Sequence, residues 1–305
     1  MRKILSITIA ILLLLSITAC GSVGDPGATG NLNVSVNGEK TEDDQNPDVD
    51  VNTDVPSNQN ITIQETVLLD EANIKITAKS FTEDSFFVKG IKLLIENNSD
   101  KDLTVQCRNS SVNGYMVDTM LSADVVSGKK ANDSLIFADS DLEACGITTI
   151  ADMEFSFHIF DSETWDDYLD TAQIQLKTSA AETYTYTYDD SGSLAYDGNN
   201  IKIIVKGIAE DSILGPGITV YIENNGDKDI TVQTRDVSIN GFMVDAMFSC
   251  DVCVGKHAVD SITFLSSELE ENEVTQIETV ELSFHVFSFS DWETIVDTDT
   301  VTISY

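Results

Sequence analysis

Two cysteines three positions apart, Cys250 and Cys253, have the spacing most often used for metal or redox chemistry. A Cys-x-x-Cys pair binds zinc when a second pair completes four thiolates, and it acts as a redox centre within a βαβ pattern. The chain has five cysteines but no second pair of this spacing, and it has no βαβ pattern. We therefore favour buried thiols at these positions, and a disulfide between Cys107 and Cys145 stays an open alternative.

Histidines are the next candidates for ligands or catalytic bases. His158 and His285 each lie in a Phe-His-Ile/Val-Phe segment, and only His257 is found elsewhere. A zinc site or a catalytic base would need further ligands or a nucleophile close by. We expect His158 and His285 to hydrogen-bond to the loop that follows, and we expect Trp165 and Trp292 to close the fold rather than to bind a ligand.

An acidic segment has the oxygen spacing with which a calcium loop begins. Its residues are Asp48-Val-Asp-Val-Asn-Thr-Asp54. Thr53 stands where the sharp turn of that loop requires Gly, and Gln59 stands where a bidentate Glu should close the site. A solvated acidic linker explains the segment, with calcium as the less favoured alternative, so no cofactor is predicted.

The elements that position these residues occur twice. Residues 73–143 align without a gap to residues 200–270, with an offset of 127 and 40 identities in 71 positions. A repeat of this length is a whole domain, since solenoid units span roughly 20–50 residues. Each of the four later cysteines aligns with a different residue in the other copy: Cys107 with Thr234, Cys145 with Asn272, Cys250 with Ala123 and Cys253 with Val126. The fold therefore does not depend on a disulfide.

Both copies alternate apolar and polar residues, as half-buried strands do. Leu103–Val112 and Ile230–Ile239 each lead into Asn-Gly, the strongest short hairpin signal. Further strands are expected near Tyr115–Val126 and in the Thr-Tyr repeat of residues 181–188, with a turn of helix near 162–169. About seven strands per copy predict an all-β chain of two tandem immunoglobulin-like β-sandwich domains, with another sandwich or a barrel as the alternative.

Charged turns kept in both copies are the candidate surface residues. They are Asp100, Lys101, Asp102, Asp227, Lys228 and Asp229, and further acids flank the Met-Val-Asp segments at Asp118, Asp124, Asp245 and Asp251. Carboxylates near loops can hold a cation, yet their spacing specifies none. Turn formation explains them equally well.

The N-terminus predicts a membrane anchor. Arg2 and Lys3 precede an apolar run over residues 4–17, which is the length of a signal peptide, and small residues lead to Cys20. A bacterial lipoprotein is cleaved before such a cysteine, whose sulfur carries a diacylglyceryl group, and two acyl chains anchor stably. The predicted division is a signal at 1–20, an acidic disordered tether at 21–60, and repeats at 61–180 and 181–305. The expected location is extracytoplasmic, on the bilayer.

The segments Ile95–Asp102, Val112–Asp118 and Glu154–Phe160, with their second-copy partners, carry a family resemblance. They resemble uncharacterised tandem-domain lipoproteins of Gram-positive bacteria, which are distantly similar to immunoglobulin-like lipoprotein domains of unknown function. The resemblance covers the signal and both repeats. It implies the anchor and the sandwich, and it implies no site residues.

The net charge and the absence of catalytic motifs exclude several classes of function. A net charge of −35 repels nucleic acid and anionic headgroups. A hydrolase triad, a phosphate-binding Gly loop and a paired carboxylate motif are absent from the sequence, so we do not expect an enzyme. The favoured hypothesis is a noncatalytic binding or adhesion module with an unknown surface or extracellular partner. The alternative is a structural envelope spacer without a ligand, and a hydrolase or metal-dependent enzyme is less favoured.

Overall fold

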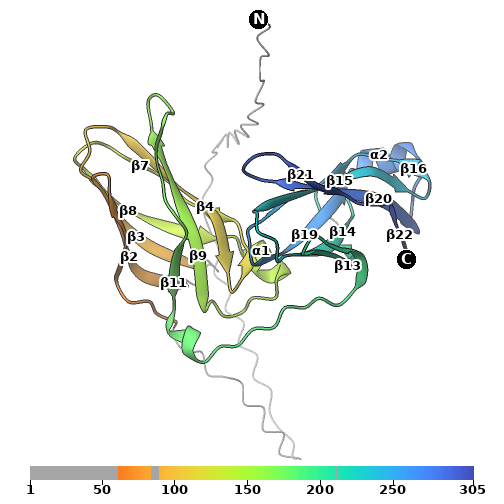
Figure 1. Cartoon of the computed structure of the whole chain (residues 1–305), viewed down its shortest axis with the longest axis horizontal. Coiled ribbons are helices and arrows are strands. Elements are labelled where there is room, and N and C mark those ends of the chain that lie inside the picture. Colours follow the sequence, from red (N-terminus) through yellow and green to blue (C-terminus); the bar gives the residue numbers. More distant parts are fainter. Residues whose placement is uncertain (1–60, 84–88, 210–211) are drawn as a thin grey trace, which may run out of the picture. The chain divides into compact units, whose positions relative to one another are not determined.

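The fold is seen in a computed structural model that describes residues 61–83, 89–209 and 212–305 (Figure 1). Cys20, the predicted signal and tether, and the calcium-like segment at 48–59 lie outside these residues. The first copy consists of β1 (Thr66–Glu71), β2 (Ile74–Glu83), β3 (Lys89–Asn97), β4 (Leu103–Val112), β5 (Tyr115–Met116), β6 (Thr119–Met120), β7 (Ser122–Val125), β8 (Lys130–Phe137), α1 (Asp139–Ala144), β9 (Asp152–Asp161), β10 (Asp167–Asp170) and β11 (Ile174–Lys177).

The second copy repeats this order after a short 3₁₀ helix. Its elements are η1 (Ser179–Glu182), β12 (Ser193–Gly198), β13 (Ile201–Ala209), β14 (Gly217–Asn224), β15 (Ile230–Ile239), β16 (Phe242–Met243), β17 (Ala246–Met247), β18 (Ser249–Val252), β19 (Lys256–Phe264), α2 (Ser266–Glu271), β20 (Thr279–Ser288), β21 (Thr294–Asp297) and β22 (Val301–Ser304). Neither α helix is long and apolar enough to cross a membrane, and the described chain holds no other α helix.

The strand pairing of each copy is that of an immunoglobulin-like sandwich. In the first copy, β1-β2-β3-β8-β6 form one sheet, and β7, β4, β9 and the β10/β11 pair form the other. Strands β2, β3 and β8 take the places of A, B and E, and the second sheet takes those of C′, C, F and G. The second copy has the same pairings, so the predicted all-β tandem sandwich is confirmed.

Each core is built by the alternation seen in the sequence. Along β3, Ile91, Leu93 and Ile95 are buried while Lys92 between them is exposed. The facing strand β9 contributes Phe155 and Phe157, whose rings are fully buried. One apolar cluster fills each sandwich, so each has a core of its own, and Ile204 and Tyr221 of the second copy join the cluster of the first.

Both Asn-Gly hairpins form as predicted. Asn113 and Gly114 have φ of 51° and 85°, and Asn240 and Gly241 have φ of 52° and 86°. These positive values are those of a type I′ turn, which Asn and Gly tolerate.

Strand forms near Tyr115–Val126 as predicted, although it is divided into the three short strands β5, β6 and β7. Two other local expectations are wrong. The expected turn of helix near 162–169 is a tight turn followed by β10. The Thr-Tyr repeat forms no strand at all, because side-chain packing takes the place of backbone pairing. Its last ring, Tyr188, stacks on His257 with 3.5 Å between the ring centroids, and its hydroxyl donates to the Asn113 carbonyl oxygen at 3.3 Å.

Two matched glycines isolate the contribution of Tyr188. A methyl group on Gly114 would lie 2.3 Å from the Tyr188 hydroxyl, whereas one on Gly241 would meet nothing within 4 Å. Both positions have the same positive φ, so Ala is equally strained at each. We expect Gly114→Ala to lower the free energy of unfolding by about 1 kcal/mol more than Gly241→Ala, because only the former disturbs the Tyr188–His257 stack. Equal denaturant midpoints for the two variants would contradict this.

Candidate functional site

A solvent-exposed tryptophan stands in the β9–β10 turn of the first copy and in the β20–β21 turn of the second. Trp165 stacks on Phe160 with ring centroids 5.4 Å apart, and Trp292 stacks on Phe287 at 5.5 Å. Each tryptophan nevertheless keeps 75% of its surface exposed. The prediction that these rings close the sandwich is therefore wrong: each indole is supported on one side and open on the other.

The backbone of these turns is strained in both copies. The Trp165 N–H donates to the Asp161 carbonyl oxygen at 2.9 Å, and the Asp161 N–H donates to the Asp166 carbonyl oxygen at 2.9 Å. This closure puts Trp165 at φ 65° and Trp292 at φ 62°. A bulky residue in the left-handed region is an outlier, since that region favours Gly or Asn. Strain of this kind is held where the surrounding structure over-determines it, often at binding sites.

The Asp-Lys-Asp turns support the tryptophan turns. Lys101 Nζ lies 2.8 Å from Asp161 Oδ2, and the Asp102 carbonyl oxygen accepts the Ser162 N–H at 3.0 Å. In the second copy, Lys228 Nζ lies 3.2 Å from Asp291 Oδ2 and 2.5 Å from Glu293 Oε2. The predicted surface residues Lys101 and Lys228 thus lie beside the tryptophan turns, a proximity that their sequence separation conceals.

The pKa values of the acids in these turns show how they are held. The hydrogen bond from Lys101, followed by the backbone N–H groups of Glu163 and Thr164, lowers the pKa of Asp161. Hydrogen bonds from Ser288, from the Glu293 N–H and from Lys228 lower the pKa of Asp291 to about 2. Both carboxylates are therefore ionised at neutral pH and fix the turn beneath the indole.

Other members of the Asp-Lys-Asp turns have structural partners as well. Asp102 Oδ1 accepts the Ser127 N–H at 2.8 Å, and Asp229 Oδ1 accepts the Val254 N–H at 2.8 Å. Asp100 and Asp227 are exposed.

A cavity of about 380 Å³ adjoins the Trp292 turn. Its wall includes Glu293 and Thr294, which follow Trp292 in the chain, together with Asp227 and Lys228. Asn199 and Asn224 add amide groups to the wall. The Asn224 amide already donates to the Lys228 and Val252 carbonyl oxygens. The turn that carries the exposed indole thus also contributes to a cavity of hydroxyl, amide and charged groups, which are suited to a ligand rich in hydroxyl groups.

The histidines lie behind these turns and have structural partners. His158 Nδ1 lies 2.7 Å from Asp170 Oδ1, and His285 Nδ1 lies 2.6 Å from Asp297 Oδ1. The partner is thus in the strand after the loop rather than in the loop itself. Each imidazole also packs against the phenylalanine that supports the tryptophan, with centroids 5.3 and 5.1 Å apart. Histidine, phenylalanine and tryptophan therefore form one aromatic row in each copy.

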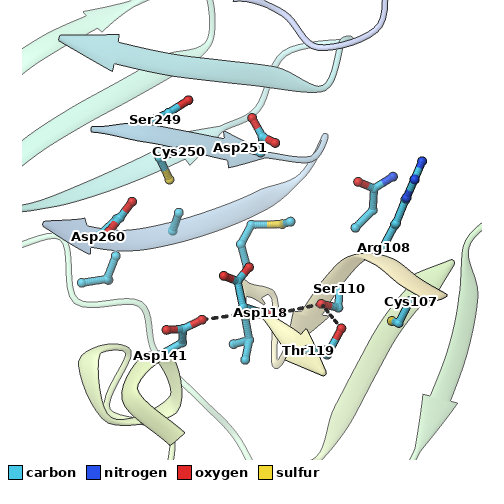
Figure 2. A pocket seen from close by; sticks show the side chains of 15 residues that line it. Cys107, Arg108, Ser110, Asp118, Thr119, Asp141, Ser249, Cys250, Asp251 and Asp260 are labelled. Carbon is cyan, nitrogen blue, oxygen red and sulfur yellow. Dashed lines mark hydrogen bonds between the residues drawn. The ribbon is translucent and has the colours of Figure 1, made fainter. Parts of the chain in front are cut away.

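A second cavity, of about 310 Å³, lies between the two copies (Figure 2). Asp118 and Asp141 enter from the first copy, and Cys250, Asp251 and Asp260 enter from the second. The Asp118 N–H donates to Asp141 Oδ2 at 2.7 Å, so one of these carboxylates has a backbone partner. The sequence analysis does not single out Asp141 or Asp260 as site residues. The available signal is an acid at the matching position of the other copy, which is Glu268 for Asp141 and Asp133 for Asp260.

Desolvation and nearby carboxylates raise the pKa of two acids in this cavity, Asp118 and Asp260. Desolvation, then the charges of Asp141 and Asp251, raises the pKa of Asp118. Desolvation is also the largest cause of the raised pKa of Asp260, against a hydrogen bond from the Ser261 N–H. Among the described residues, no group of three or more His, Cys, Asp or Glu side chains is arranged to hold a metal ion.

Asp118→Asn removes the charge that desolvation and repulsion disfavour, and it should give a pH-dependent gain in stability. Because folding raises the pKa of Asp118, its protonated form favours the folded state, and that contribution is lost as the pH rises through the folded pKa. The variant should therefore be more stable than the wild type at pH 7, and the gain should shrink toward pH 4. The gain should be less than about 1 kcal/mol, because Asp118 is only partly desolvated and keeps much of its side chain in contact with water. Urea denaturation across this range measures it. The control Asp100→Asn removes an exposed charge elsewhere, and an equal gain there would contradict the local origin.

The four cysteines in the described part of the chain are free thiols. Cys250 and Cys253 are buried, and burial raises the pKa of Cys253 to about 12 and that of Cys250 well above its usual value. Burial also raises the pKa of Cys107 to about 11 and that of Cys145 to about 12. A thiol at such a pKa is protonated at neutral pH, and the protonated form is neither the nucleophile nor the metal ligand.

Comparisons with known proteins add little to this geometry. No protein-family model matches the chain, and no curated protein matches it either. Among solved structures, a crystal structure of the YadV chaperone is similar over 76% of this chain and 100% of its own, with 10% sequence identity and a TM-score of 0.24. At so low a TM-score, the fold assignment rests on the strands and sheets described above.

Proposed function

We propose that the protein is a membrane-anchored, extracytoplasmic, noncatalytic binding module that holds its ligand on the exposed faces of Trp165 and Trp292. The observation that carries the proposal is the recurrence, in both copies, of a strained and open tryptophan supported by phenylalanine. Placing a large apolar ring in solvent at a strained backbone position costs stability, and the stacking on phenylalanine covers only one face of the ring. The signal-like segment that ends at Cys20 supports the anchor.

The chemistry of the site favours a saccharide as ligand. One face of a sugar ring carries C–H groups that pack flat on an indole, while its hydroxyl groups form hydrogen bonds at the edge. The cavity that adjoins the Trp292 turn offers both donors and acceptors, from Asp227, Lys228 and Glu293. Beside Trp165, the Thr164 hydroxyl and Asp166 lie in the same turn as the indole and are 2.9 Å apart. Two such sites on one chain suit a polymer, whose repeated rings engage both sites and raise the avidity.

Binding of defined polysaccharides by the full chain in lipid vesicles tests the proposal. Soluble glucans, chitin oligosaccharides and isolated cell-wall glycan are titrated while tryptophan fluorescence is recorded. We expect saturable binding of at least one glycan, with fluorescence changes that persist at 1 M salt, because stacking is not screened as ion pairs are. A spacer would show no saturable binding to any of them. Binding that salt abolishes would instead indicate a cation on the indole face.

A further inference from the structure

The contact between the two copies joins unlike surfaces. On the first copy it uses a surface that we call the hairpin face, formed by Tyr115, Met116 and Glu154. On the second copy it uses a strand face, formed by Lys256, His257 and Val259. Each copy has both faces, because the copies share one fold, and the internal contact occupies only one face of each.

The occupied contact combines backbone pairing, apolar packing and an ion pair. The His257 N–H donates to the Gly114 carbonyl oxygen at 2.9 Å, which pairs β19 with β5 in parallel. Tyr115 is only 5% exposed, and Met116 packs against the core of the second copy. Lys256 Nζ lies 2.7 Å from Glu154 Oε1.

The unoccupied hairpin face belongs to the second copy and exposes apolar residues. The offset of 127 places Phe242 and Met243 at the positions of Tyr115 and Met116. These two side chains are 46% and 67% exposed. Glu281, which matches Glu154, is exposed as well.

The unoccupied strand face belongs to the first copy and is complementary in charge. Lys129 matches Lys256, and Lys130 and Asn132 match His257 and Val259. All three side chains are exposed. An ion pair from Lys129 to Glu281 would reproduce the internal pair of Lys256 and Glu154.

We propose that a second copy of this chain occupies these faces, so that the first repeat of one molecule docks on the second repeat of the next. The partner is identified by the internal contact, in which the same two faces already bind each other. Contacts between unlike faces generate a ring where the rotation from one molecule to the next closes, and an open head-to-tail chain where it does not. The free faces lack counterparts of Tyr188 and His257, so association is weaker than the internal contact and increases with concentration.

Sedimentation velocity of the full chain in detergent, over a wide range of concentration, tests this assembly. We expect oligomers that grow with concentration and involve no disulfide. Phe242→Asp and Lys129→Glu should each raise the dissociation constant at least about tenfold, which is about 1.4 kcal/mol. Combining Lys129→Glu with Glu281→Lys should restore association, because the reversed pair again has opposite charges.

Leu194→Asp is the matched control, since Leu194 is 60% exposed on β12 and belongs to neither face. It should leave association unchanged, and thermal melting of every variant confirms that it is folded. A chain that stays monomeric at all concentrations overturns the proposal. So do oligomers that are indifferent to Phe242→Asp and to both charge changes, because they would form through another surface.

Discussion

Replacing both Trp165 and Trp292 by Gly should abolish saturable ligand binding while leaving the fold almost as stable as before. Each substitution removes a stacking contact worth about 0.5–1.5 kcal/mol. It also relieves a left-handed backbone that costs a bulky residue about 1–2 kcal/mol. These terms oppose each other, so the free energy of unfolding should change by no more than about 1 kcal/mol per site.

The single variants distinguish one site from two. If a polymeric ligand engages both indoles, then Trp165→Gly or Trp292→Gly alone removes the avidity, which is about 10²–10⁴-fold for linked sites. Short oligosaccharides that reach one site should lose only half of their binding capacity. Fluorescence titration with long and short glycans measures both effects, and Leu194→Ala serves as a control for loss of an exposed apolar side chain. Wild-type affinity in the double variant would rule out the indole faces as the site.

Replacing Asn97 by Asp should destabilise the first copy more than any surface change. Asn97 is fully buried, and its Nδ2 donates to the Lys101 carbonyl oxygen at 2.8 Å and to the Val125 carbonyl oxygen at 2.7 Å. Its Oδ1 accepts the Ser99 N–H at 3.0 Å. A carboxylate would replace the donating NH₂ group with an oxygen that faces two carbonyl oxygens. It would also bury a negative charge for which only the Ser99 donors would remain.

The expected loss is at least about 3 kcal/mol in the free energy of unfolding. Asn224 makes the same two donor contacts in the second copy, to Lys228 and Val252, so Asn224→Asp should have a comparable effect there. Asn98→Asp is the control, because Asn98 is exposed and adjacent. Chemical denaturation followed by circular dichroism provides the measurement. If Asn97→Asp and Asn98→Asp had the same midpoint, the buried amide would not be what holds the turn.

The alternation of apolar and polar residues is sufficient to predict the sandwich fold, but it does not predict the candidate site. Leu103–Val112 and Ile230–Ile239 have in the structure the bounds that their alternation and the following Asn-Gly predict. The Thr-Tyr repeat alternates equally well yet forms no strand, since alternation describes side-chain direction and does not supply a neighbouring strand edge. A pattern within one segment cannot distinguish these two outcomes.

The site depends on distances between segments that the sequence leaves far apart. Lys101 and Asp161 are 60 positions apart, and their contact forms only when β4 and β9 lie side by side. A tryptophan at the same position of both copies singles out Trp165 and Trp292, but their residue type predicts burial. Its exposure follows from the left-handed backbone of a short turn, which residue type does not reveal. The acids of the cavity between the copies come from two domains, so no local pattern could have grouped them.

The contact between the copies joins unlike surfaces, and it therefore fixes the order of the two repeats in the chain. Tyr115 lies opposite His257, whereas its counterpart Phe242 would lie opposite Lys130 only in the proposed contact with another molecule. Two tandem copies of the first repeat would bring Lys130 to the junction and would have Leu94 in the place of Tyr221, whose hydroxyl lies 2.6 Å from His257 Nδ1. The two repeats are therefore not interchangeable, because each carries the side chains that its own position at the junction requires.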